Sequence, residues 1–177
     1  GEILGADIML EWIYLTNRVR YSEIFENQKI RENDFCHNSL IKQENRIFGK
    51  LATKALNLNE NEISRLYEED LYQLILHEVG HTLGLNHNFA ASTLHNNSDV
   101  HNPEITYKEG LSSSVMDYHA LNIAPIGVKQ GQYADVKPGK YDILAIKYGY
   151  TPKLSKKDLN NMLEKYSSDE YLFGNDG

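Results

Sequence analysis

Three histidines at a fixed spacing constrain this 177-residue chain more than any other feature of its sequence. His77, Glu78, His81, Gly84 and His87 follow the pattern H-E-x-x-H-x-x-G-x-x-H. Residues four positions apart on an α-helix are separated by about 40° and about 6 Å, so His77 and His81 project side by side. Gly84 can adopt the left-handed backbone that ends a helix, and this reversal brings His87 back toward them. The spacing therefore predicts a metal site made of three imidazoles.

The predicted site has the chemistry of a catalytic zinc centre. Three neutral imidazoles leave one position of a zinc ion open, which distinguishes catalytic from structural zinc sites. Zinc lowers the pKa of a bound water to about 7. Glu78 lies about 100° around the helix from His77, which makes it a poor third ligand but a well-placed general base. It can take the proton of the attacking water and then, as general acid, give it to the leaving amine. These residues favour hydrolysis of peptide bonds with one Zn²⁺ ion.

A second motif, SVMDY at residues 114–118, follows the histidines. Together the two motifs resemble the active-site helix and the Met-turn of the metzincin clan of zinc endopeptidases. The resemblance implies that Met116 forms a hydrophobic base beneath the metal. Some metzincins, among them the astacins and serralysins, place a tyrosine two residues after that methionine. Tyr118 matches this position, which implies a residue that ligates zinc or moves out to stabilise the oxyanion.

A closer resemblance covers residues 1–150. The segments GEILGADI, HEVGHTLGLNHNFAAST, SSVMDY and KYDILAIKYGY are similar to the C-terminal part of the catalytic domain in large, mostly uncharacterised bacterial zinc metalloproteases with a met-zincin domain. This implies an α+β fold, a protein or peptide substrate, and an extracytoplasmic location (secreted, periplasmic or envelope-associated). Metzincins carry further strands and a long helix ahead of the strand expected here, so the resemblance also implies a single, partial catalytic domain. Residues 1–84 would end its N-terminal subdomain and include the active-site helix. Residues 85–177 would form its C-terminal subdomain.

The hydrophobic pattern predicts the main elements. Apolar residues with few polar breaks favour a strand at 3–15, and helical spacing favours helices at 16–31 and 34–55. The active-site helix is expected to start between Ser64 and Glu69, to end at Leu83, and to bury its leucine, isoleucine and valine side chains. The polar sequence of residues 86–114 has no periodicity and predicts a long loop. Loops of such a length are usually functional. Irregular chain and two late helices, at about 139–149 and 155–166, complete the prediction.

Composition excludes several functional classes. The net charge of −7, from 25 acidic and 18 basic residues, argues against a nucleic-acid partner. No apolar run reaches the roughly 20 residues of a membrane-spanning helix. The single cysteine, Cys36, rules out an internal disulfide, and we expect it to be buried. The first residues, GEILGADIMLEW, contain neither an initiating Met nor a signal peptide, so we expect a fragment of a longer protein.

Other residues offer alternative roles. Glu104 is the alternative third zinc ligand, as in gluzincins, but its Asn-Pro-Glu setting favours a turn and His87 has the better spacing. The loop 95–104, with Asp99, could bind calcium but lacks regular oxygen-ligand spacing, so a solvated loop is expected. The metzincin resemblance implies that residues 123–131 form an apolar wall of the specificity pocket. Four further histidines could serve as additional ligands: His37, His95, His101 and His119. His119 could instead face the substrate, because it directly follows the Met-turn.

A rival function belongs to another class of protein. The chain could be a zinc-binding but non-catalytic module, derived from a metzincin, that recognises a peptide or partner through the same cleft. Glu78 counts against this alternative, because a site without catalysis does not need that carboxylate. The expected absence of the upstream half counts for it.

Overall fold

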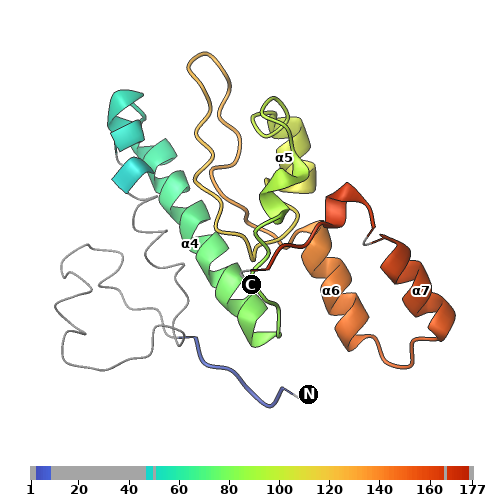
Figure 1. The fold of residues 1–177 in the computed structure, drawn as a ribbon. Coiled ribbons are helices and arrows are strands. Elements are labelled where there is room, and N and C mark those ends of the chain that lie inside the picture. Colours follow the sequence, from blue (N-terminus) through green and yellow to red (C-terminus); the bar gives the residue numbers. More distant parts are fainter. Residues whose placement is uncertain (1–2, 9–46, 50, 166, 176–177) are drawn as a thin grey trace.

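The computed structural model describes residues 3–8, 47–49, 51–165 and 167–175 of the chain. Its main helices are α4 (Glu60–Thr82), α5 (Pro103–Glu109), α6 (Lys140–Tyr150) and α7 (Lys156–Lys165). Two short 3₁₀ helices, η2 (Ala91–Leu94) and η3 (Asp169–Tyr171), lie between and after them. The long helix α4 is flanked by an extended loop, with α5 beyond that loop and the α6–α7 pair to one side (Figure 1).

Helix α4 starts earlier than its hydrophobic pattern predicts. Its N-cap is Asn59, whose side chain accepts a hydrogen bond of 3.0 Å from the backbone N–H of Glu62. Glu60 and Glu62 place negative charge in the first turn, where the helix dipole favours it. The result is a helix of 23 residues that ends, as expected, at the reversal around Gly84.

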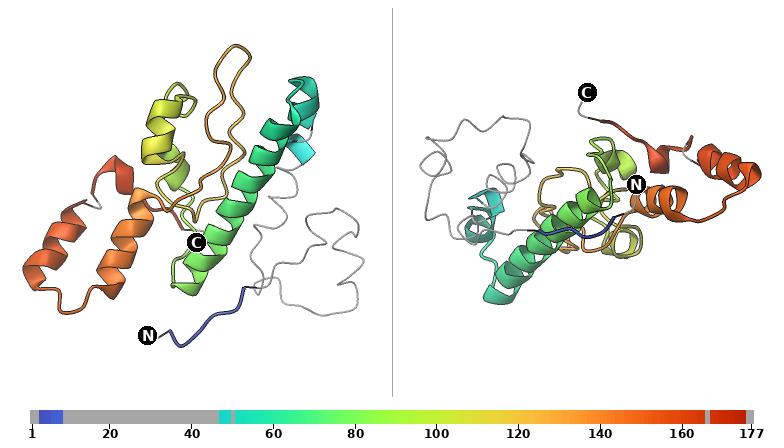
Figure 2. Two further views of the ribbon diagram at one scale, coloured as in Figure 1. Left: turned by 180° about the vertical axis from the view of Figure 1, so that it is seen from behind. Right: turned by 90° about the horizontal axis from the view of Figure 1, so that it is seen from below.

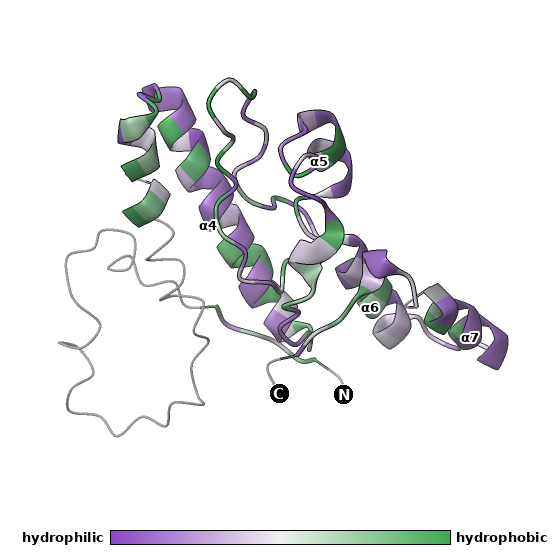
Figure 3. Ribbon diagram, turned by 45° about the horizontal axis from the view of Figure 1, so that its top comes forward, coloured by the Kyte–Doolittle hydropathy of each residue, from purple (hydrophilic) through white to green (hydrophobic). Residues whose placement is uncertain are grey.

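The buried face of α4 is largely polar. Leucine, isoleucine and valine side chains were expected to bury this helix, but Ile75 and Leu83 are each 37% exposed. Hydrophilic and hydrophobic residues alternate along α4 in Figure 3. The residues that are buried recur at steps of three and four and therefore share one face. They are Leu66, Asp70, Gln73, His77 and Gly80.

The long loop after the Met-turn packs against this face. Leu66 joins Leu121, Tyr133 and Ala134 in the core cluster. The N-terminal half of α4 also holds the loop by hydrogen bonds, because Glu69 accepts from the backbone N–H groups of Tyr133 and Ala134. The two views of Figure 2 agree that the loop runs beside α4. The loop is thereby fixed next to the helix that carries His77 and His81.

The remaining element predictions have mixed outcomes. The two late helices are confirmed as α6 and α7. Residues 86–114 were expected to form a loop, but they contain η2 and also α5, which Asn102 caps by accepting from the N–H of Glu104. Residues 3–8 have no regular structure, and no strand occurs in the described ranges, so the α+β class stays a prediction. The helix expected at 16–31 lies outside the described residues, as does most of the one at 34–55, of which residues 47–49 and 51–55 are helical.

The helices in the described part of the chain are too short or too polar to span a membrane.

Candidate metal centre

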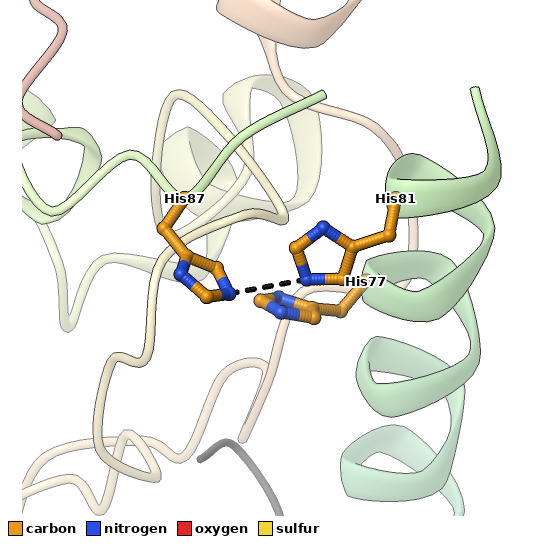
Figure 4. A group of neighbouring side chains, drawn as sticks. All are labelled: His77, His81 and His87. Carbon is orange, nitrogen blue, oxygen red and sulfur yellow. Dashed lines mark hydrogen bonds between the residues drawn. The ribbon is translucent and has the colours of Figure 1, made fainter. Parts of the chain in front are cut away.

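His77, His81 and His87 converge on one point. Each ring offers one nitrogen, and these three atoms lie within 4.8 Å of one another. His77 and His81 project from successive turns of α4, and His87 reaches toward them from the chain that follows the helix (Figure 4). The Nε2 atoms of His81 and His87 are 3.1 Å apart. Such a cluster of nitrogens can accept one metal ion.

The backbone fixes which ring nitrogens are available. Nδ1 of His77 lies 2.8 Å from the carbonyl oxygen of Val115, and Nδ1 of His81 lies 3.1 Å from that of Leu85. Because a carbonyl oxygen only accepts hydrogen bonds, both Nδ1 atoms carry the proton. Their Nε2 atoms are therefore left with a lone pair, as metal-ligating histidines require. The donor set fits zinc, which binds neutral imidazole nitrogens.

A sharp reversal after α4 brings the third histidine into position. Gly84 has a φ of 86°, in the left-handed region that a side chain disfavours. The N–H groups of Gly84 and Leu85 donate to the carbonyls of His81 and Gly80, which closes the end of the helix. The chain then turns back, and His87 lies beside His81.

Glu78 is the carboxylate nearest in sequence to the histidines, and it is half-buried. Burial raises the pKa of the Glu78 carboxyl, while the neighbouring His81 and His87 oppose that rise. A carboxylate in this setting can exchange a proton with a group held at the metal site.

The Met-turn lies beneath the histidines, and a missing side chain on α4 makes room for it. Met116 is fully buried. A Cβ atom added to Gly80 would overlap the Met116 sulfur, so only glycine allows this contact. Sequence reasoning did not single out Gly80, although its place between two proposed ligands was the available signal.

Tyr118 approaches the histidines from the Met-turn side. Its hydroxyl oxygen lies 2.6 Å from Nε2 of His87. Its ring centroid is 5.2 Å from that of His77 and 5.5 Å from that of Phe89. The hydroxyl is thus within reach of any group that the three histidines hold.

Two buried aspartates, which sequence reasoning also missed, hold the Met-turn and the residues just before it in place. Asp142 of α6 accepts hydrogen bonds from the Ser114 hydroxyl and the N–H of Val115. Asp135 accepts from the N–H groups of Leu111 and Ser112. Since Val115 in turn bonds His77, Asp142 contributes indirectly to the orientation of that ring.

The other predicted residues lie apart from the histidine cluster. His119 does not belong to it, because its Nε2 lies 3.0 Å from the amide of Gln73 and 3.2 Å from the carboxylate of Asp135. His95 contacts the carbonyl of Gly110 at 2.8 Å. The Asn-Pro-Glu segment was expected to form a turn, but Glu104 stands in the first turn of α5 and is exposed. His37 and Cys36 lie outside the described residues.

Comparison with known proteins identifies the family. No curated protein and no solved structure gives a significant match to the chain. The Met-zincin family matches it over residues 59–177, which include α4, the three histidines and the Met-turn. That match confirms the resemblance deduced from the two motifs. Because it covers more than half of the sequence, the chain belongs to the Met-zincin family of metallopeptidase-like domains.

Proposed function

We propose that this protein is a zinc-dependent endopeptidase in which His77, His81 and His87 bind one Zn²⁺ ion. The observation that carries the proposal is the convergence of three ring nitrogens within 4.8 Å, with Glu78 next to one of them in the sequence. Zinc at this position would polarise the substrate carbonyl and activate the attacking water.

Each neighbouring residue has a distinct task in the proposed reaction. Glu78 accepts the proton of the attacking water and then delivers it to the leaving amine. Tyr118 donates a hydrogen bond from its hydroxyl to the developing oxyanion, a role supported by its 2.6 Å approach to His87. Met116 forms the apolar base below the ligands, where burial keeps it in place.

The proposed substrate is a protein or peptide. The family match supports this proposal, because Met-zincins are metallopeptidase-like domains. Residues 123–131 expose Ile126 (90%) and Val128 (46%), but the carbonyl of Gly131 accepts from Arg65, 12 positions before His77 on α4, so their role as an apolar pocket wall stays a prediction. The metzincin resemblance supports a place of action outside the cytoplasm.

Cleavage of an unfolded protein by the zinc-loaded chain tests the proposal. We expect Glu78→Ala to retain zinc and to lose activity by about 10²–10⁴-fold, the usual contribution of a general base. Glu68→Ala is the matched control, because Glu68 is an exposed glutamate on the same helix, and it should cleave like the parent.

Two outcomes would contradict the proposal. Equal turnover by Glu78→Ala and the parent would remove Glu78 from the mechanism. A parent that binds one zinc ion and cleaves nothing would favour the non-catalytic recognition module.

A further inference from the structure

His87 differs from the other two histidines in how it is supported. His77 and His81 belong to a 23-residue helix, whereas His87 lies on the chain after the reversal. Its position therefore depends on what holds the residues that follow it. Those residues, 88–90, contact a segment near the C-terminus of the chain, Tyr171–Gly174, which we call the C-terminal strap.

Asn88 is the centre of this contact. Its side chain is fully buried. The side-chain amide donates to the carbonyl of Leu172 at 3.0 Å, and its oxygen accepts from the N–H of Gly174 at 3.0 Å. The same oxygen accepts from the N–H of Ala90 at 3.3 Å. One side chain thus links the residue after His87 to a segment more than 80 positions away.

Backbone contacts extend this connection on both sides of Asn88. The N–H of Phe89 donates to the carbonyl of Gly174 at 2.8 Å, so the strap is bonded to two successive residues. The N–H of Asn88 donates to the carbonyl of Met116 at 3.0 Å. The residues after His87 are therefore held between the Met-turn and the strap.

The strap is itself tied to the rest of the fold. Glu170, immediately before it, forms an ion pair of 3.0 Å with Lys140 at the start of α6. The same ammonium group lies 3.1 Å from Glu109 at the end of α5. The strap therefore offers Asn88 an anchored partner.

We propose that Asn88 is a positioning residue for the metal centre, which acts by tying His87 to the C-terminal strap. The inference rests on the proposed function only in requiring that His87 binds zinc. Partners that orient metal ligands affect metal affinity strongly, and their mutation usually weakens it about 10–100-fold.

The proposal has a reciprocal consequence that can be measured. If the strap favours zinc binding through His87, zinc must stabilise the strap by the same free energy. Zinc should therefore slow hydrogen exchange at the N–H groups of Phe89 and Gly174, because both donate hydrogen bonds between the C-terminal strap and residues 88–90.

The experiment compares zinc affinities, measured by chelator competition, in the full chain and three variants. Asn88→Ala should bind zinc about 10–100-fold more weakly than the parent. Asn122→Ala is the matched control, because its amide also makes two 3.0 Å bonds to carbonyls, of Val100 and Gln132, away from the strap. It should retain the affinity of the parent. Gly174→Pro removes the donor on the strap and leaves Asn88 intact, and it should also weaken zinc binding.

The outcomes separate this proposal from the function on which it rests. Equal zinc affinity in Asn88→Ala and Asn122→Ala would overturn it, as would unchanged exchange at Phe89 and Gly174 on adding zinc. If Asn88→Ala does not fold, Gly174→Pro decides the question, and parental affinity there overturns the proposal. A parent that binds zinc but cleaves nothing refutes the peptidase alone, while a parent that binds no zinc refutes both.

Discussion

At the scale of single residues, the metal centre depends on a position that has no side chain. Gly80 lies between the proposed ligands His77 and His81 and lets the Met116 sulfur approach the helix. A Cβ atom at this position would overlap that sulfur, and Met116 is fully buried. Met116 and helix α4, which carries His77 and His81, therefore pack closely at Gly80.

We expect Gly80→Ala to lower the free energy of unfolding by about 1–3 kcal/mol, the usual cost of overpacking a buried site. The added methyl group would displace Met116, so zinc affinity should fall as well. Chemical denaturation and zinc titration measure the two effects. Gly149→Ala is the control, since Gly149 lies in α6 with open space around its Cβ position. It should raise stability by about 0.4–1 kcal/mol. Parental stability in Gly80→Ala would refute the packing argument.

The histidines were predictable from sequence because their arrangement is local. Helix geometry places His77 and His81 together, and Gly84 permits the reversal that returns His87. Asn88 was not predictable, because its partners Leu172 and Gly174 are 84 and 86 positions away. Residue type alone does not say which distant carbonyl a buried amide will find.

At the scale of elements, one ammonium group joins three parts of the fold. Lys140 begins α6, and it bonds Glu109 at the end of α5 and Glu170 in η3. The hydrogen bond from Lys140 lowers the pKa of Glu109. Burial acts to lower the pKa of Lys140, but its hydrogen bonds to Glu170 and Glu109 outweigh burial and raise it.

These shifts predict a pH window for the stabilisation. Because the pKa of Glu109 is lowered on folding, its contribution is present above its unfolded value, about 4.3, and is lost as pH falls through the folded value. Because the pKa of Lys140 is raised, its contribution is present below about 10.4 and is lost as pH rises through the folded value. The ion pairs should therefore stabilise the fold most between about pH 5 and pH 10.

The variant Lys140→Met tests this window. In the middle of the window it should cost up to about 1 kcal/mol in the free energy of unfolding, since the group is partly exposed. The cost should shrink below about pH 4, as urea denaturation at several pH values would measure. Lys137→Met is the control, because the ammonium group of Lys137 bonds the backbone carbonyls of Tyr107 and Lys108 and not a carboxylate. A cost for Lys140→Met that stays constant down to pH 2 would contradict the assignment.

Elements were predicted best where their signals were apolar and periodic. The late helices α6 and α7 follow such patterns. Helix α4 starts earlier than predicted because its first turn is charged, with Glu60 and Glu62, and is stabilised by the Asn59 cap, which accepts from the N–H of Glu62. Helix α5 was missed because its seven residues depend on the Asn102 cap and not on an apolar stripe. The division at residue 84 into two subdomains stays a prediction.

At the scale of the whole molecule, metal binding and folding are linked. A ligand that binds only the folded state stabilises it by RT ln(1 + [L]/Kd). We expect free zinc at 100 times its Kd to raise the free energy of unfolding by about 2.7 kcal/mol, and a chelator to reverse the rise. Denaturation with and without zinc measures this effect.

Two histidine variants locate the source of that stabilisation. His87→Ala should lose most of the zinc-dependent rise. His95→Ala should keep it, because His95 contacts the carbonyl of Gly110 and lies outside the cluster. Equal loss in the two variants would mean that zinc acts elsewhere on the chain.

The reversal at Gly84 also bears on the order in which the centre forms. The three histidines come from residues 77–87, whereas Met116 and Tyr118 enter from a later part of the chain. Closing a short loop costs less chain entropy than closing a long one, and local contacts form fastest during folding. During folding, we therefore expect the turn that carries the histidines to close early. Met116 should then pack against it in a later and slower step.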